Sequence, residues 1–161
     1  MHPVSFVGAG PGAEDLLTLR AARHLREADV LVWTDSLISP AIPALAPAHC
    51  ERIRTSSLTL EQVIPILISR QRDGKRVVRL HDGDTSLYSA INEQICALSD
   101  AGIAVNVVPG ISAYQAAAAG LSCELTIPGV VQTIVLGRAG GRTGVPDRES
   151  LNHLAALQAS F

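Results

Sequence analysis

The stretch PVSFVGAGPG, residues 3–12, runs from apolar residues directly into a cluster of glycines. Residues 3–8 have the length and composition of a short buried strand. Gly8, Gly10 and Gly12 allow backbone conformations, and a close approach of ligand, that a side chain would block. A strand followed by a glycine-rich turn is therefore the first element that the sequence predicts.

Similar strands recur along the chain and alternate with helical patterns. We expect strands over residues 30–33, 51–53, 75–80 and 103–108, and helices over 19–28, 59–72, 86–98 and 113–119. Thr18 and Thr59 are candidate N-caps, and the small side chains of the last helix predict close packing on the sheet. Alternating strands and helices imply parallel pairing. The predicted fold class is α/β, with a mostly parallel five-stranded sheet flanked by helices.

Four unusual loops each follow a predicted strand. They are GAGPG (8–12), TDS (34–36), HDGDT (81–85) and PGIS (109–112). In open sheets of this kind, ligands bind outside the carboxyl ends of the strands. The four loops together therefore predict a binding wall along one edge of the sheet.

Composition excludes several classes of protein. The 161 residues are 47% hydrophobic and 17% charged, which predicts a folded chain, and the net charge of −2 argues against a nucleic-acid partner. The three cysteines lie far apart and match neither zinc spacing nor a disulfide framework. We see no signal peptide and no membrane span, and expect a cytoplasmic protein.

The glycine loop alone supports more than one interpretation. With Ala13, residues 8–13 match the dinucleotide pattern G-x-G-x-x-G/A, and Asp35 lies at the end of the next strand. Pro11 argues against that reading, because proline has no N–H to offer a pyrophosphate. A purely structural turn is a further alternative.

The other loops are equally ambiguous when each is taken alone. Asp82 and Asp84 have a spacing that can hold a divalent cation, but they can also hydrogen-bond a ligand or cap the following helix. Ser112 is a candidate helix cap, and Asp35 is a candidate Asx-turn residue. His81 is a candidate base or a simple hydrogen-bonding residue. No single loop decides the function.

Five blocks taken in order are more specific. They are GAGPG…LLTL, ADVLV-x-x-DSLIS, RLHDGDTSLYSAI-x-EQ, VVPGISAYQAAAA and LTIPGVVQTIVL. This ordered set resembles the tetrapyrrole methylase family over essentially the whole chain. The DSLIS, LYSAINEQ and IPGVVQT stretches resemble the branch that methylates precorrin-4 or cobalt-precorrin-4 at C11 in cobalamin (vitamin B12) biosynthesis.

The resemblance implies two α/β domains with a cleft between them. Residues 1–125 correspond to the N-terminal domain, and residues 126–161 correspond to an incomplete start of the C-terminal one, with a strand over 130–136 and a helix over 148–160. The implied activity is transfer of a methyl group from S-adenosylmethionine to a corrin or porphyrin precursor. An inactive fragment that lacks half of the site, and an NAD-dependent oxidoreductase, are the alternatives.

The resemblance also implies roles for individual residues. Pro11 would lie near the methyl donor on the tetrapyrrole side, and Asp35 would be the acid/base carboxylate. The remaining cofactor-binding positions would be Asp82, Gly83 and Asp84 bordering S-adenosylmethionine, Leu87 beneath it, and Ser112 and Ala113 at its amino-acid end. No metal is required. The implied partners are a tetrapyrrole substrate and, because the family is commonly homodimeric, a second copy of the chain.

Two positions depart from the family pattern, and two more invite a substrate role. Thr85 stands where the family usually has proline, so the rigidity of that loop is in question, and Val131 replaces a small hydroxylic residue. Arg138 and Arg142 can pair with substrate carboxylates. They can equally form a solvated basic loop.

Overall fold

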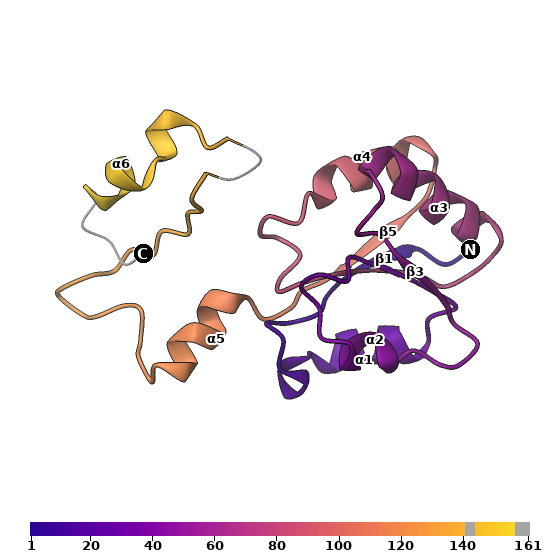
Figure 1. Cartoon of the computed structure of the whole chain (residues 1–161), viewed down its shortest axis with the longest axis horizontal. Coiled ribbons are helices and arrows are strands. Elements are labelled where there is room, and N and C mark those ends of the chain that lie inside the picture. The colour runs from indigo at the N-terminus through magenta and orange to yellow at the C-terminus, as the bar shows by residue number, and fades with distance from the viewer. Residues whose placement is uncertain (141–143, 157–161) are drawn as a thin grey trace. The chain divides into compact units, whose positions relative to one another are not determined.

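The computed structural model describes residues 1–140 and 144–156, and the chain divides into two compact units, Met1–Ala116 and Ala117–Phe161. The first unit contains all five strands (Figure 1). They are β1 (Val4–Gly8), β2 (Val30–Trp33), β3 (Glu51–Arg54), β4 (Val77–His81) and β5 (Val105–Val108). The helices between them are α1 (Leu19–Arg26), α2 (Ala41–Ala44), α3 (Leu60–Arg72) and α4 (Ile91–Asp100), with a short 3₁₀ turn, η1, over Glu14–Leu16.

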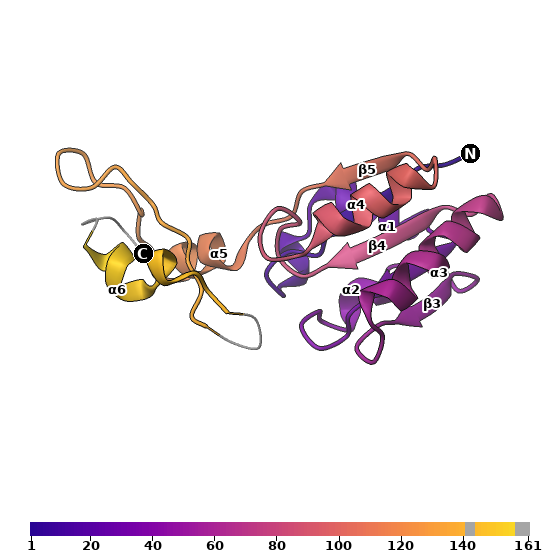
Figure 2. The same ribbon diagram turned by 90° about the horizontal axis from the view of Figure 1, so that it is seen from above.

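The five strands form one parallel sheet in the order β3-β2-β4-β1-β5, which confirms the predicted fold class. Figure 2 shows β3 and β5 at opposite sides of this sheet. Because every strand runs in the same direction, the loops that follow the five strands all leave the same edge. The sheet topology therefore places the predicted binding loops together.

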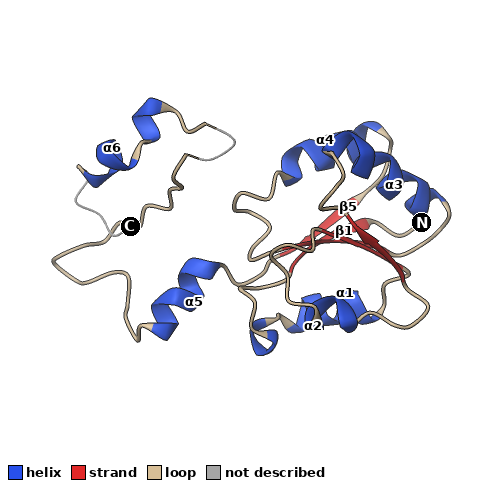
Figure 3. Ribbon diagram, viewed as in Figure 1, coloured by secondary structure: helices blue, strands red, loops and turns tan. Residues whose placement is uncertain are grey.

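Helices cover both faces of the sheet, with α1 and α2 on one face and α3 and α4 on the other (Figure 3). The two faces follow from the alternation of side chains along each strand. In β2, Leu31 and Trp33 pack in the cluster under α1 and α2, whereas Val30 and Val32 pack in the cluster under α3 and α4. Each apolar strand thus contributes to two cores.

Two helices begin at the predicted caps. The Thr18 hydroxyl accepts a hydrogen bond from the Ala21 N–H at 3.1 Å, which satisfies one of the unpaired donors at the start of α1. At the start of α3, Thr59 and Gln62 form a reciprocal capping box. These side-chain bonds explain why both helices begin where the sequence predicts.

The helix predicted over residues 86–98 begins later, at Ile91. The Asp84 carboxylate accepts a hydrogen bond from the Ser86 N–H at 2.9 Å, so the chain turns instead of entering a helix. Tyr88 and Ala90 then adopt positive φ values of 56° and 47°, which interrupt any regular helix. The short helix α2 was not predicted either.

The second unit differs more from the prediction. No strand forms over residues 130–136, where Val131 and Ile134 are single bridge residues, and Val131 pairs with Ile127. Helix α5 (Ala113–Gly120) spans the boundary and contains no buried residue, so the predicted close packing of this helix is wrong.

Near its end, the chain contains a 3₁₀ turn, η2 (Asp147–Glu149), and helix α6 (Leu151–Ala155). The helix predicted over residues 148–160 is therefore shorter, and residues 157–160 lie outside the described range. The predicted domain boundary after residue 125 remains a prediction.

Candidate active site

Backbone hydrogen bonds tie together the loops that follow β1 and β4. The Gly10 N–H donates to the Gly83 carbonyl at 3.1 Å, and the Gly83 N–H donates to the Gly10 carbonyl at 2.9 Å. The Ala9 N–H donates to the His81 carbonyl at 2.7 Å. The two loops therefore pair through an isolated antiparallel bridge just beyond the sheet, which holds Pro11 and Gly83 close together.

The loop after β5 meets the other two through glycines. A Cβ atom added to Gly110 would lie 2.1 Å from the Gly83 carbonyl oxygen, and one added to Gly8 would lie 2.6 Å from the Gly110 nitrogen. Separations below 3.0 Å are not found for real Cβ atoms. Three backbones thus approach so closely that only glycine fits at Gly8 and Gly110. This contact builds one surface from three loops.

Asp84 fixes the same contact with its side chain. One carboxylate oxygen accepts from the Gly110 N–H at 2.9 Å, and the other accepts from the Ser86 N–H and hydroxyl. Burial alone would raise the pKa of Asp84, but the hydrogen bonds from Ser86 and Gly110 outweigh burial and hold the pKa below its ordinary value. The ionised Asp84 carboxylate therefore connects the loop after β4 to the loop after β5 by hydrogen bonds.

Ser112 and Ala113 stand at the start of α5. The Ser112 N–H donates to Oε1 of Gln115 at 2.9 Å, and the Ser112 carbonyl accepts from the Gln115 N–H. This is half of a capping box, which is the structural alternative for Ser112. A Cβ added to Gly83 would lie 4.0 Å from the Ser112 Cα, so this residue borders the three-loop contact.

Three other predicted cofactor residues lie on the same loops. Pro11 and Leu87 are half-buried, and Asp82 is exposed. Thr85, where the family usually has proline, is 2% exposed. The substitution therefore places a buried threonine in a loop that Asp84 already holds.

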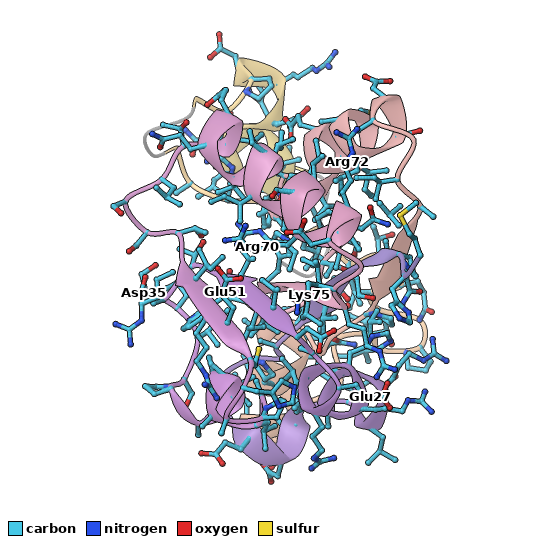
Figure 4. All side chains as sticks on the ribbon, turned by 90° about the vertical axis from the view of Figure 1, so that its right-hand side faces the viewer. Glu27, Asp35, Glu51, Arg70, Arg72 and Lys75 are labelled. Carbon is cyan, nitrogen blue, oxygen red and sulfur yellow. The ribbon has the colours of Figure 1, made fainter. Side chains whose placement is uncertain are left out.

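Asp35 lies apart from the three-loop contact, in the loop after β2 and beside the outer strand β3 (Figure 4). Its carboxylate oxygen is 4.0 Å from Nε of Arg54. A hydrogen bond from Ser56 and, less strongly, the charge of Arg54 lower the pKa of Asp35 below its ordinary value. Asp35 is thus an exposed, ionised carboxylate on the same edge of the sheet, because β2 is the neighbour of β4.

A buried polar network, which the sequence patterns did not indicate, links the loop that contains Asp35 to α4. The Arg79 guanidinium donates to Gln94 Oε1 at 3.2 Å and to Thr55 Oγ1 at 3.2 Å. Thr55 in turn lies 3.1 Å from the Thr34 hydroxyl, next to Asp35. Burial lowers the pKa of Arg79 to about 10, so the side chain stays charged. The arginine inside the apolar strand VVRLH was the available signal.

His81 is buried on the same side of β4 as Arg79. Its ring stacks on Phe6 with centroids 5.8 Å apart, and its Nε2 has no hydrogen-bond partner among the described residues. Burial, together with the charge of Arg79, lowers the pKa of His81 to about 3. His81 is therefore neutral near pH 7 and lies beneath the loop rather than in it.

The geometry argues against the dinucleotide alternative. A dinucleotide loop leads directly into a helix whose N-terminus faces the pyrophosphate. Here the 3₁₀ turn η1 intervenes, and α1 begins only at Leu19.

Within the described residues, no group of three or more His, Cys, Asp or Glu side chains is arranged to hold a metal ion. In the same part of the chain, no helix has both the length and the hydropathy to cross a bilayer.

Arg138 and Arg142 give no evidence of a substrate site. Arg138 donates to the Gly144 carbonyl at 3.2 Å, within its own loop. Arg142 lies outside the described residues.

Comparison with known proteins defines the class to which this fold and these loops belong. The sequence matches the family of Tetrapyrrole (Corrin/Porphyrin) Methylases over residues 3–160. The chain therefore belongs to the tetrapyrrole methylase family. Among curated relatives, it is 43% identical over 150 residues to the cobalt-precorrin-4 C(11)-methyltransferase of Priestia megaterium, matching 93% of this chain and 58% of the relative. It is 43% identical over 158 residues to the precorrin-4 C(11)-methyltransferase of Pseudomonas aeruginosa, matching 98% of this chain and 63% of the relative.

Solved structures agree with this placement. The X-ray structure of cobalt precorrin-4 methyltransferase, a cobalamin biosynthetic enzyme, superimposes with a TM-score of 0.90 at 42% identity, over 94% of this chain and 64% of that one. Uroporphyrin-III C-methyl transferase from Thermus thermophilus, complexed with S-adenosyl homocysteine, gives a TM-score of 0.71 at 34% identity, over 81% and 56%. The chain thus spans about three fifths of the length of such relatives.

Proposed function

We propose that this chain takes part in transfer of a methyl group from S-adenosylmethionine to C11 of precorrin-4 or cobalt-precorrin-4. The observation that carries the proposal is the three-loop contact of Gly8, Gly83 and Gly110 at the carboxyl edge of the sheet. It stands in a chain whose curated relatives are named for that reaction. Backbone that approaches this closely leaves room for a ligand over the loops, where side chains would otherwise lie.

The chemistry requires alignment more than acid or base strength. S-adenosylmethionine supplies a methyl group on a sulfonium, which is activated toward in-line displacement by an electron-rich ring carbon. Holding the two reactants in line can lower the barrier by roughly 7–11 kcal/mol. We assign that positioning to the loop residues Pro11, Asp82 and Gly83, with Leu87, Ser112 and Ala113 bordering the cofactor.

Asp84 and Asp35 have different roles in the proposal. Both Asp84 carboxylate oxygens already hold the loops, so it acts on the cofactor by fixing the loop geometry. Asp35 keeps a low pKa and stays ionised, which suits a carboxylate that stabilises positive charge on the pyrrolic ring. Accepting a proton from the ring is a second role that the ionised form allows.

Titration calorimetry of the chain with S-adenosylhomocysteine tests the proposal. Saturable binding at one site is the expected result, and an Asp35→Asn variant should bind equally well but slow methyl transfer by roughly 10²–10⁴-fold in a protein completed with the remaining length of its relatives. Asp100→Asn, at the exposed end of α4, is the matched control. If only the completed protein binds, the chain is an inactive fragment of the site. If the completed protein also fails to bind, the methyltransferase proposal is wrong.

The proposal also covers the cellular location, the domain boundary and the assembly of the protein. We expect a cytoplasmic protein, because all three cysteines are free thiols and two of them, Cys96 and Cys123, are exposed. We keep the domain boundary after residue 125, and a homodimer as the assembly. Analytical ultracentrifugation tests the assembly directly.

A further inference from the structure

A cavity of about 440 Å³ lies between the outer strand β3 and the short helix α2, away from the three-loop contact. Its lining includes the apolar side chains of Trp33, Ile38 and Pro40, and the charged side chains of Asp35, Arg52 and Arg54. This volume falls within the range of small-molecule pockets, which are typically apolar with a few placed polar groups. The methyl-transfer roles assigned above use only Asp35 from this cavity.

The alternation of side chains along β3 places both arginines in the cavity. Ile53 packs in the cluster on the α3 side, and Glu51 pairs there with Arg70 at 2.7 Å, as Figure 4 shows for these two labelled residues. Arg52 and Arg54 therefore lie on the opposite face, toward α2. Because α2 comprises only Ala41–Ala44, it leaves that end of the sheet open.

Both guanidinium groups make contacts within the protein but keep N–H donors that these contacts do not use. Arg52 donates through Nη2 to the Ala46 carbonyl at 2.8 Å, and no carboxylate of the described residues lies within ion-pair distance of it. Arg54 lies 4.0 Å from the Asp35 carboxylate, and its guanidinium carbon is 6.0 Å from the centre of the Trp33 ring. Each guanidinium has five N–H donors, so these contacts leave several unused. Two cations and one carboxylate give the cavity one excess positive charge.

We propose that this cavity binds a carboxylate side arm of the tetrapyrrole substrate. The inference rests on the proposed function and assigns Arg52 and Arg54 as its specificity-determining residues. The planar guanidinium fork matches a carboxylate in two parallel hydrogen bonds, and the apolar wall suits the methylene groups of an acetate or propionate arm. Since β2 is the neighbour of β4, the cavity and the cofactor loops share one edge of the sheet, and a large planar substrate can reach both.

Trp33 is the only tryptophan of the chain and lines the cavity, so its fluorescence reports on occupancy. The probe is porphobilinogen, a monopyrrole with one acetate and one propionate arm. Titration should change Trp33 emission saturably. Arg54→Gln should weaken the apparent affinity about 10-fold, as expected for loss of a charge-assisted hydrogen bond. Arg54→Lys should fall between, because it keeps the charge and loses the fork.

Arg72→Gln is the matched control, because Arg72 is an exposed arginine at the end of α3 and lies well apart from Asp35 in Figure 4. This variant should titrate like the unaltered chain. Equal melting temperatures of the three variants would show that folding is not the cause of any difference.

Three outcomes would overturn the inference. The first is the lack of a saturable change in Trp33 emission, and the second is an affinity for porphobilinogen that neither Arg52→Gln nor Arg54→Gln weakens. The third is displacement by inorganic phosphate at the same concentration as porphobilinogen, which would show a general anion site. Calorimetry with S-adenosylhomocysteine on the same samples separates this inference from the proposed function. Unchanged cofactor binding with no Trp33 response rejects only the carboxylate site in the cavity. A Trp33 response without cofactor binding by the completed protein rejects the proposed methyltransferase function.

Discussion

Arg79 and His81 lie on the same side of β4, and both are 7% exposed. Of these two bases, only Arg79 carries a charge near neutral pH, because burial and the neighbouring guanidinium keep His81 in its neutral form. Protonating His81 would place a second positive charge beside the first in a site that solvent does not reach. The cost of that second charge makes the fold sensitive to acid.

We expect the free energy of unfolding to fall as the pH drops from 6.5 toward 5. The folded pKa of His81, about 3, lies below the ordinary value of 6.5, so below pH 6.5 the unfolded chain binds a proton that the folded chain does not. The slope from this residue approaches about 1.4 kcal/mol per pH unit. Urea unfolding at several pH values measures it.

A His81→Leu variant should show a shallower pH dependence over the same window. An equal slope in the His81→Leu variant and the unaltered chain would contradict the assignment of the acid sensitivity to His81.

The same two residues show what local sequence patterns cannot reveal. In VVRLH, polar residues 79 and 81 alternate with apolar neighbours, which predicts a strand with one polar face. That face is buried under α4, where Gln94 supplies the partner for Arg79. The partner lies 15 residues away and belongs to a helix whose start was itself wrongly predicted, so local patterns could not reveal the network. The sequence offered Asp84 as a ligand-binding residue or a helix cap, but it could not show that both carboxylate oxygens bind the protein itself.

At the scale of elements, the loops after β1, β4 and β5 depend on one another. The sheet brings them to one edge, and the contact between Gly110 and Gly83 fixes their separation. Replacing Gly110 by alanine forces backbone apart, because the atom that the new methyl group meets is a carbonyl oxygen rather than a flexible side chain.

We expect Gly110→Ala to lower the free energy of unfolding by about 3 kcal/mol or more, at the upper end for overpacking, and to abolish any binding of S-adenosylhomocysteine. Gly120→Ala is the control, since nothing lies within 4 Å of a Cβ added there and alanine favours the helix. Chemical denaturation of both variants, with calorimetry, provides the measurement. A Gly110→Ala protein as stable as the control would show that the loops can separate at no cost.

Four of the five strands were largely predictable, since β1, β2, β4 and β5 are mostly apolar runs bounded by polar or glycine-rich loops, whereas β3 (ERIR) has a single apolar residue. Prediction failed where a tertiary contact competes with local preference. Asp84 turns residues 86–90 away from the helix that their sequence favours, and residues 130–136 have strand composition but form only single bridges, with no strand beside them among the described residues. The cavity at Arg52 and Arg54 could not be predicted, because the length of α2 determines whether that face is open.

At the scale of the whole molecule, burial is confined to one part of the chain. The residues of both cores lie between Val4 and Val108, and none of the described residues after Val108 is buried. The second unit instead exposes large apolar side chains, among them Leu121 at 76% and Val130 at 76%. Stability should therefore differ strongly between the two units.

Hydrogen exchange followed by mass spectrometry should show this difference. Amides of β1 and β4 should exchange only through global unfolding, and those over residues 117–140 should exchange at least about 10³-fold faster. The amides of residues 115 and 116 in α5, which precede that range, provide an internal comparison, since they are hydrogen-bonded but not buried. Slow exchange throughout residues 117–140 would contradict the expectation and show that this unit is protected by association.

The strand order β3-β2-β4-β1-β5 also has a consequence during synthesis. β1 is made first, yet its two partners, β4 and β5, are made last. At a translation rate of about 5–20 residues per second, the apolar strand β1 waits roughly 4–15 s before β4 has been made. During that interval it is an unpaired apolar segment, and we expect the yield of folded protein to rise when chaperones shield this strand until its partners have been made.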